Sequence, residues 1–535
     1  MDLFRNYCLG NQRRKPSQPY LSESASGCEF SGIACLASLP QALCRSAMSR
    51  LVIRKGLWKA LAVSVIGLCL LADCTPLKNS RLLAAALAEA GAALGDSGTQ
   101  WMVLVCAGCY FIAFLALRRR TASLQVDFLL MGMLGLAALA YALRYAGAVG
   151  SAQALTLVSG AMIGQGAALW AGRPSTTYSR WQISNGANGI VLPLIILLAW
   201  AAVWQGETGR LFQYRGEARW SGPWDNPNIF GVLMGVGVVL AVGRMVAGNA
   251  EMLKTEKLKA EGEKAERDGQ CPPANIEHPA SNWRVWLMRA FLLAAAVVMG
   301  VGLVKSYSRG AWVGTAVGVA YLAYQVGKAE KLKTGHRWVA LSVMCASIAV
   351  LTFWSLRETE WRPVRRVVSV GNINDFSWRN RVAAWEGALQ MMADKPWFGF
   401  GWNQPERVYD SLYRPARLTE GGAMQMNDCL MLGTTLGVPA LLCFLMYVGL
   451  SLKGSPKSKV QSPTAREQRT EDRGRRSEVG LPNTDHRILI TDYWAKAVCR
   501  AGAVILLVGF WFDGGLFKLA TAAPFWILLA VGRDD

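Results

Sequence analysis

Histidine is scarce in this sequence. Only His278, His336 and His486 occur among 535 residues, and the thirteen cysteines form no cluster with them at the spacing of a zinc site. Several cysteines lie in or beside apolar runs, where cysteine behaves as a small hydrophobic residue. They are Cys69, Cys106, Cys109, Cys345, Cys429, Cys443 and Cys499. We therefore predict that the chain holds no metal ion.

Charged residues are also few, at 17% of the chain, whereas 52% of the residues are hydrophobic. The apolar residues form runs close to the length of about 20 residues that spans a bilayer, which excludes a string of soluble domains. A spanning segment must satisfy its own backbone hydrogen bonds, so we expect helices. The prediction is an all-α, polytopic membrane protein of about 12 transmembrane helices, with a long loop that contains short helices. The runs fall near 57–73, 101–117, 127–143, 152–171, 188–204, 228–246, 285–304, 310–326, 338–356, 429–451, 500–514 and 519–532.

The first 47 residues lack both a long apolar run and the apolar core of a signal peptide. From Met48 onward, basic residues precede a first apolar run, as at the start of many membrane proteins. We expect either that translation begins at Met48 and residues 1–47 are an extension of the gene model, or that they form a disordered tail.

The net charge of +21 is concentrated between the apolar runs. If the spans alternate, the basic segments 118–120, 251–269, 327–337 and 452–478 share one side, which the positive-inside rule makes cytoplasmic, together with both termini. No nucleic-acid partner is needed to explain this charge. The expected organisation is an extension (1–47), an N-terminal transmembrane bundle (48–246), a flexible cytoplasmic linker (247–284), central transmembrane helices (285–356), an outer loop (357–427), a transmembrane helix (428–452), a flexible cytoplasmic basic linker (453–497) and C-terminal transmembrane helices (498–535).

The expected outer loop favours arginine strongly over lysine. It holds a single lysine, Lys395, and nine arginines: Arg357, Arg362, Arg365, Arg366, Arg379, Arg381, Arg407, Arg414 and Arg417. Arginine presents a planar fork that suits phosphate and carboxylate groups. The loop therefore indicates an anionic headgroup or a phosphorylated lipid as ligand. Ordinary ion pairs within the loop and with membrane lipids are the alternative.

Two further segments on this side carry polar residues. "VGLVKSYSRGAWVG" (301–314) places Lys305 and Arg309 at the outer turn of a helical hairpin, where both could simply extend to the membrane surface. The second segment, residues 375–396 within the outer loop, has the spacing of a helix, with Trp378 and Trp385 on one stripe. That helix could lie on the membrane or pack on neighbouring helices.

Three motifs, in this order, resemble the O-antigen ligase and polymerase superfamily. They are "SYSRGAWVG" (306–314), "WRNRVAAWEGALQMMADKPWFGFGWNQ" (378–404) and "MNDCLMLGTTLGVPALL" (426–442), and "WDNPNIFGVLMGVGVVLAV" (224–242) is similar to a segment that opens a middle span there. The resemblance implies a glycosyltransferase in the bacterial inner membrane whose active site faces the periplasm. It implies an undecaprenyl-diphosphate-linked glycan as donor, a glycan or lipid-linked acceptor, and no cofactor.

The resemblance also implies site residues. Arg309 matches the arginine of the Ser-Arg-Gly motif, and Arg379 or Arg381 matches the arginine of the loop helix. We expect substrate contacts from Arg365, Arg366, Asn427, Asn228 and Trp402. Ligases of the family carry histidine where this chain has Met426, so a carboxylate would have to act as base. The candidates are Asp428, which is preferred, and Glu420, Asp410, Glu406 and Asp513; a helix-start role is the alternative for Asp428.

Two other classes of function stay open at this point. A transporter or flippase for a polyprenyl-linked glycan would also carry intramembrane charges, although such proteins place them near the midplane and have related halves. A non-catalytic scaffold would tolerate changes at Arg309 and Arg381. The clustering of charge at one interface favours the transferase.

Overall fold

The computed structural model describes residues 124–143, 147–171, 181–214, 217–224, 226–267, 282–330, 376–402, 404–416, 427–453 and 484–533. All of them lie in one compact unit that begins at Leu61. The predictions for the N-terminal extension, for the runs 57–73, 101–117 and 338–356, and for Arg365, Arg366, Glu420 and Met426 fall outside the described residues.

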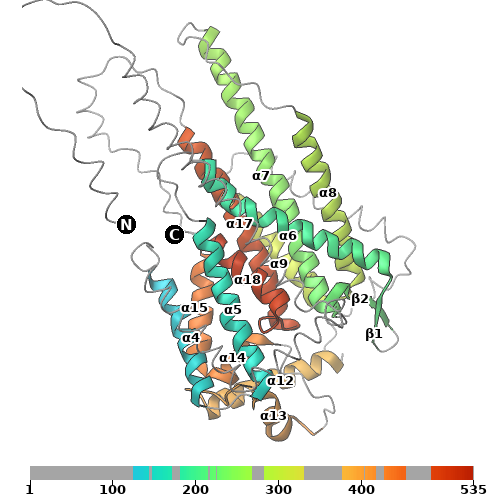
Figure 1. The fold of residues 1–535 in the computed structure, drawn as a ribbon, viewed down its shortest axis with the longest axis vertical. Coiled ribbons are helices and arrows are strands. Elements are labelled where there is room, and N and C mark those ends of the chain that lie inside the picture. The colour runs from blue at the N-terminus through green and yellow to red at the C-terminus, as the bar shows by residue number, and fades with distance from the viewer. Residues whose placement is uncertain are drawn as a thin grey trace, which may run out of the picture. The chain divides into compact units, whose positions relative to one another are not determined.

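The described residues are mostly helical, as predicted (Figure 1). The long helices are α4 (Leu124–Leu143), α5 (Gly147–Ala171), α6 (Trp181–Thr208), α7 (Pro227–Arg267), α8 (Asn282–Lys305), α9 (Arg309–Glu330), α12 (Phe376–Asp394), α15 (Val438–Leu452), α17 (Thr484–Phe512) and α18 (Leu519–Gly532). Shorter elements are η1 (Gly222–Trp224), α13 (Gln404–Val408), the π-helical turn η3 (Tyr409–Tyr413) and α14 (Asp428–Leu436). An antiparallel hairpin, β1 (Leu211–Tyr214) and β2 (Glu217–Trp220), pairs Leu211 with Trp220.

Four of the described helices are long and apolar enough to cross a membrane. The spans are Gly189–Thr208, Pro227–Ala247, Val285–Lys305 and Tyr493–Phe512, and shorter apolar helices lie at Val126–Leu139, Val438–Leu452 and Leu519–Gly532. Each overlaps a run predicted from the sequence, although Tyr493–Phe512 begins before the run 500–514 and Val438–Leu452 covers only the second part of the run 429–451. The total of about 12 spans stays a prediction.

Three boundaries differ from expectation. α7 continues as helix to Arg267, so the first part of the expected flexible linker 247–284 is helical. α17 begins at Thr484, within the expected basic linker. The expected single helix 428–452 is divided at Gly437, whose φ of 91° is left-handed and which ends α14 and precedes α15. Charge patterns locate solvated segments, but they do not show where a helix stops.

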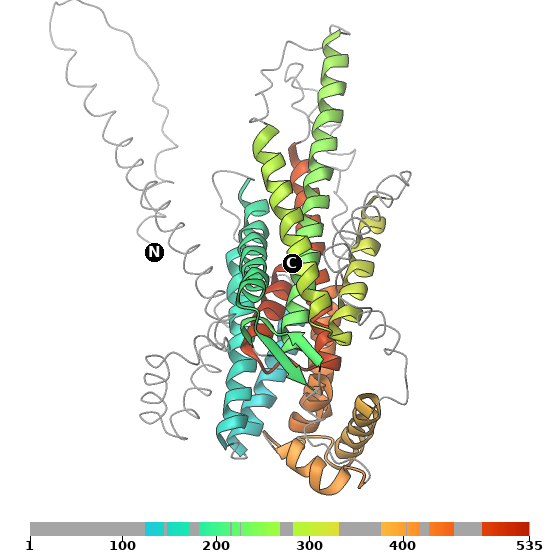
Figure 2. The ribbon, with the colours of Figure 1, turned by 90° about the vertical axis from the view of Figure 1, so that its right-hand side faces the viewer.

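The core forms around α7 and α18. Ala520 through Gly532 of α18 are all buried, and α18 packs against α5 and α17. Trp526 contacts the rings of Phe444, Tyr447 and Phe525. A Cβ on Gly160 would lie 2.6 Å from the Trp526 ring, so glycine in α5 permits this close helix contact, as small residues do between membrane helices. Figure 2 shows α7 alongside α8.

Ion pairs mark the two ends of this bundle. At one end, Arg533 after α18 donates to Asp127 in the first turn of α4 at 2.6 Å. At the other end, the start of α9 and the end of α17 meet α12. We call this second end the site end.

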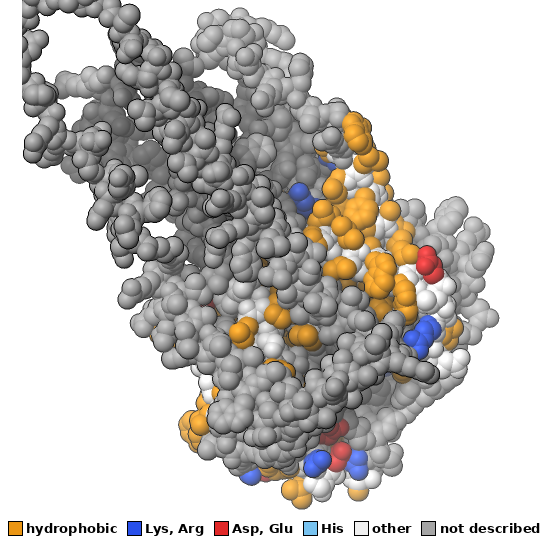
Figure 3. Space-filling model, in the orientation of Figure 1, with side chains coloured by type: hydrophobic (Ala, Val, Ile, Leu, Met, Phe, Trp, Pro, Cys, Tyr) orange, Lys and Arg blue, Asp and Glu red, His pale blue; other side chains and the backbone are white. Residues whose placement is uncertain are grey.

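Large apolar side chains are exposed on the outward faces of α6 and α8. They include Ile196, Trp200 and Val203 of α6 and Trp283, Trp286, Leu287 and Phe291 of α8. Figure 3 shows an elongated hydrophobic band on the face in view. Such faces are expected where lipid is the solvent, since isolated soluble proteins rarely expose large apolar patches.

Candidate functional site

The turn between α8 and α9 is built by its own serines. Ser306 Oγ donates to the Leu303 carbonyl at 2.7 Å and accepts the Ser308 amide at 3.2 Å. Ser308 Oγ accepts the Ala311 amide at 3.3 Å and so caps the start of α9. Tyr307 has a φ of 50°, an uncommon value for a residue other than glycine. The "SYSRG" letters therefore specify a tight, polar turn at the site end.

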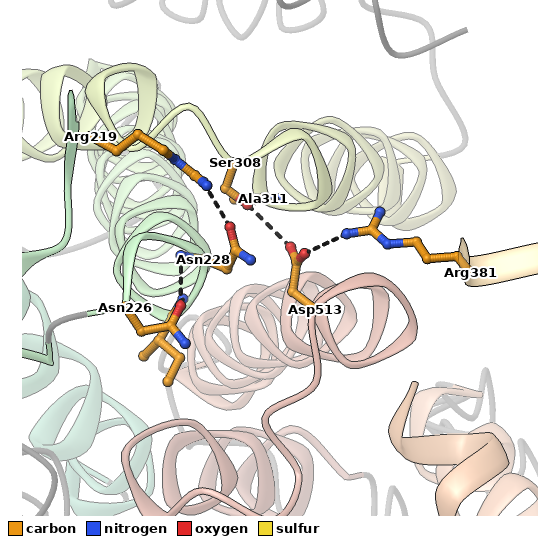
Figure 4. Close-up of polar contacts among 8 residues, drawn as sticks. Arg219, Asn226, Asn228, Ser308, Ala311, Arg381 and Asp513 are labelled. Atoms are coloured by element: carbon orange, nitrogen blue, oxygen red, sulfur yellow. Dashed lines mark hydrogen bonds and ion pairs between the residues drawn. The ribbon is translucent and has the colours of Figure 1, made fainter. Parts of the chain in front are cut away.

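Asp513 joins this turn to the arginine-bearing helix α12. Its Oδ2 accepts the Ser308 hydroxyl at 3.1 Å, and its Oδ1 accepts Arg381 Nη2 at 3.1 Å (Figure 4). Only 5% of the Asp513 side chain and 14% of the Arg381 side chain are exposed. Three segments that lie far apart in the sequence thus meet at one carboxylate.

The guanidinium of Arg381 has N–H donors that the bond to Asp513 does not use. Its Nε is buried and has no hydrogen-bond partner among the described residues. Arginine carries five N–H donors in a fixed fork, and the hydrogen bond to Asp513 uses Nη2. Asp513 therefore fixes the direction of the side chain without occupying all of it.

A second arginine, which sequence reasoning missed, holds the other side of the turn. Arg219, from strand β2, donates from Nε to the Ser306 carbonyl and from Nη2 to Asn228 Oδ1, both at 2.8 Å. Asn226 Oδ1 in turn accepts the Asn228 amide at 2.9 Å and caps α7. Figure 4 shows the Asn228 side chain between Arg219 and Asp513. The Asn-Pro-Asn letters thus build a helix start that is fixed to the turn.

Lys305 is also held by the hairpin. Its Nζ lies 5.1 Å from the centre of the Trp220 ring, next to Arg219. A cation over an indole face is attracted by the ring. Lys305 therefore contacts another part of the protein at the site end. This contact adds to the expectation from the sequence that Lys305 extends to the membrane surface.

Asp428 lies on α14, whose nine residues are too few to cross a membrane. Its side chain is 2% exposed, and its Oδ2 accepts the Leu516 amide at 2.6 Å. Burial raises the pKa of this carboxyl to about 7, against the lowering effects of the Leu516 and Gly515 amides and of Lys518. Asp428 thus holds the segment that follows Asp513 between α17 and α18.

This pKa predicts a pH dependence of stability. In the unfolded chain the pKa of Asp428 is its ordinary value of 3.8, and in the folded chain burial raises this pKa to about 7. The folded chain binds more protons between these values, so raising the pH through this window lowers the free energy of unfolding. From about pH 6 to about pH 8 we expect a loss on the order of 1 kcal/mol in the wild type and none from this source in Asp428→Asn.

Thermal unfolding in lipid nanodiscs at several pH values measures this difference. Asp410→Asn is the control, because Asp410 pairs with Arg414 on a half-exposed surface and should leave the pH profile of the wild type unchanged. Parallel profiles for the wild type and Asp428→Asn would show that Asp428 does not carry the effect.

The other predicted residues are placed as follows. Arg309 is the first residue of α9 and is half-buried beside Ser308, whereas Arg379 is exposed on α12. Asn427 is buried and caps α14 by accepting the Leu430 amide at 3.0 Å. Trp402 is 1% exposed, and its indole donates to the Ala137 carbonyl at 3.2 Å.

The structure therefore brings Arg381, Asn228 and the start of α9 together. Asn427 caps α14, and Trp402 is buried in the core, so the substrate contacts expected of these two residues stay predictions. Trp378 packs on Trp385, and Trp385 packs on Trp511 of α17, with ring centres 5.6 Å apart at each contact. Of the two arrangements considered for α12, the described contacts agree with packing on neighbouring helices.

Comparison with known proteins bears on this site. Residues 294–445 match the family model for O-antigen ligase, whereas none of the curated proteins compared with the chain matches it. The matched segment contains Ser308, Arg309, Arg381 and Asp428, and the partners Arg219 and Asp513 lie outside it. Together with its apolar helices, this indicates a multi-pass membrane protein. Residues 294–445 are thus similar to the O-antigen ligase domain.

Proposed function

We propose that this protein is a membrane glycosyltransferase that transfers or polymerises a glycan from an undecaprenyl-diphosphate donor at the periplasmic face of the inner membrane. The observation that carries the proposal is the contact of Asp513 with Arg381 and Ser308, two residues of the segment that matches the O-antigen ligase family model. A guanidinium held in place by a buried carboxylate, with donors left over, suits a diphosphate.

The proposed reaction needs stabilisation of negative charge. The acceptor hydroxyl oxygen attacks the anomeric carbon of the donor glycan, and the bond from that carbon to the diphosphate oxygen breaks with its electron pair. The hydroxyl proton passes to water, and the lipid diphosphate leaves with one more negative charge than it had in the donor. Arginine side chains that are already oriented can stabilise this charge without reorganisation during the reaction.

We propose distinct roles for the residues of the site. Arg381 and Arg309 bind the diphosphate from the two sides of the Ser308 turn, where the positive end of the α9 dipole also favours an anion. Arg379, which is exposed two residues before Arg381 on α12, contacts the donor more weakly from outside. Asp428 acts as a positioning residue, since its carboxylate is committed to the Leu516 amide.

A transfer assay with the purified full chain in nanodiscs tests the proposal. The donor is a glycan on undecaprenyl diphosphate, and the acceptors are a free glycan, a second donor molecule and a lipid-linked core sugar. We expect a new glycosidic product, release of undecaprenyl diphosphate, and the same rate with EDTA. The acceptor that reacts separates ligase from polymerase.

The same preparation distinguishes the transferase from a transporter. In proteoliposomes, a flippase would move the lipid-linked glycan between leaflets without forming a bond, and the donor would be recovered intact. That outcome would overturn the proposal. A strain lacking the protein should likewise accumulate lipid-linked units, and complementation by Arg309→Ala should fail at equal expression.

A further inference from the structure

The turn after α12 is held firmly by its backbone. The Val438 amide donates to the Pro396 carbonyl at 2.7 Å, and the Phe400 amide donates to the Thr434 carbonyl at 2.8 Å. Gly399, with a φ of 59°, lies so close to α14 that a Cβ would stand 2.4 Å from the Thr434 carbonyl oxygen. The turn is thus fixed to the end of α14 and the start of α15.

Two aromatic side chains nevertheless point away from the protein. Trp397 is 70% exposed and Phe398 is 52% exposed, whereas Phe400, two residues on, is buried. The backbone is hydrogen-bonded at Pro396 and at Phe400, on either side of these two residues. Their exposure is therefore a fixed feature of the turn. An exposed indole and an exposed phenyl ring side by side form an apolar surface that needs an occupant.

The neighbouring helix indicates which occupant fits. α15 is apolar and exposes Leu442, Leu445, Met446 and Leu450 along one face, with the spacing of a single helical stripe. Val438 and Pro439 are half-exposed at its start, where the turn is bonded to it. The exposed rings therefore lie at the end of a helix whose apolar stripe is suited to lipid chains.

The charge of the turn agrees with a lipid headgroup. Lys395 is exposed, and its Nζ lies 4.5 Å from the centre of the Phe400 ring. Tryptophan is enriched at the boundary between lipid chains and headgroups, and lysine nearby can reach the phosphates. If a protein partner covered the two rings, there would be no need for an exposed apolar stripe along α15 next to them. A lipid surface explains both features.

We infer that the turn Lys395–Phe400 is a membrane anchor that inserts Trp397 and Phe398 among phospholipids of the leaflet at the site end. The anchor fixes the C-terminal end of α12 at the membrane surface. Because α12 carries Arg381, the anchor also sets the height of the arginine relative to that leaflet. The inference does not depend on the proposed reaction.

Photo-crosslinking of the full chain tests the anchor directly. p-Benzoylphenylalanine is placed singly at Trp397, at Phe398, at Met446 as a position on the lipid-facing stripe, and at Glu386 as an exposed charged position on α12. The variants are irradiated in nanodiscs of phosphatidylethanolamine and phosphatidylglycerol, and intact masses are measured. We expect the mass of one phospholipid to be added at positions 397, 398 and 446 and not at 386.

Two results would overturn the inference. Lipid adducts at position 446 without adducts at 397 and 398 would show that the turn stands clear of the membrane. Adducts with the mass of a second copy of the chain would show that the rings cover a subunit contact instead. Met446 reports in the same experiment that the irradiated protein is folded in the bilayer, and the two turn positions report independently of each other.

Discussion

Replacing Arg381 with alanine is expected to lower the rate of glycan transfer by about 10²–10³, the loss seen when one preorganised transition-state donor is removed. The substitution deletes the guanidinium that Asp513 orients, and it leaves that carboxylate with the Ser308 hydroxyl. The rate in the nanodisc transfer assay, with donor above its apparent KM, measures the effect on the chemical step.

Arg379→Ala is the matched control, because Arg379 lies on the same helix but is exposed. We expect a smaller loss there, mainly in the apparent KM for donor. Arg381→Lys keeps the charge and loses the planar fork, so it should recover only part of the rate. If Arg381→Ala and Arg379→Ala have equal and small effects, the buried pair is structural and the diphosphate site lies elsewhere.

Gly310→Ala should lower transfer by about 10²-fold, the scale of loss that a displacement of about 1 Å can produce in a catalytic arrangement. A Cβ on Gly310 would lie 2.3 Å from Asp513 Oδ2 and 3.0 Å from the Phe512 Cβ. The added methyl must push Asp513 away from Ser308, and Arg381 loses its direction. No charged or polar group of the site is removed.

Gly135→Ala provides the comparison, since a Cβ there would meet nothing within 4 Å. Both glycines lie in helices, so both variants make the same chemical change. The unfolding temperature of Gly135→Ala should be close to that of the wild type. Any lowering of the unfolding temperature of Gly310→Ala should be too small to account for its loss of activity. Full activity of Gly310→Ala would mean that the position of Asp513 does not matter for transfer.

Local features of this chain were predictable from the sequence. Apolar runs of sufficient length located the helices from α4 to α9, and the spacing of Trp378 and Trp385 located α12. The Ser-Arg-Gly letters pointed correctly to a polar turn. Each of these signals lies within one short segment, and the physics that it reflects, burial of one helix face or a tight turn, is local.

Contacts between distant segments were not predictable in the same way. Asp513 is 132 residues from Arg381 and 205 from Ser308. The spacing of apolar residues along the sequence does not predict contacts between residues so far apart. From the sequence, Asp513 is only one of five candidate acids, and Asp428 is preferred because it lies two residues from Met426. The sequence gives no indication of the role of Arg219 either. Its strand is four residues long and carries little signal.

The length of α7 offers a way to image this protein by electron microscopy. Its 41 residues, at about 1.5 Å per residue, make a rod of about 60 Å, roughly twice the thickness of the hydrocarbon core. One end is capped by Asn226 at the site, and the other extends past the apolar span, which ends at Ala247. A helical marker protein fused in register at Arg267 would share one continuous helix with the site. Single-particle images could then be aligned on the marker, and donor-bound and empty states compared without an antibody fragment.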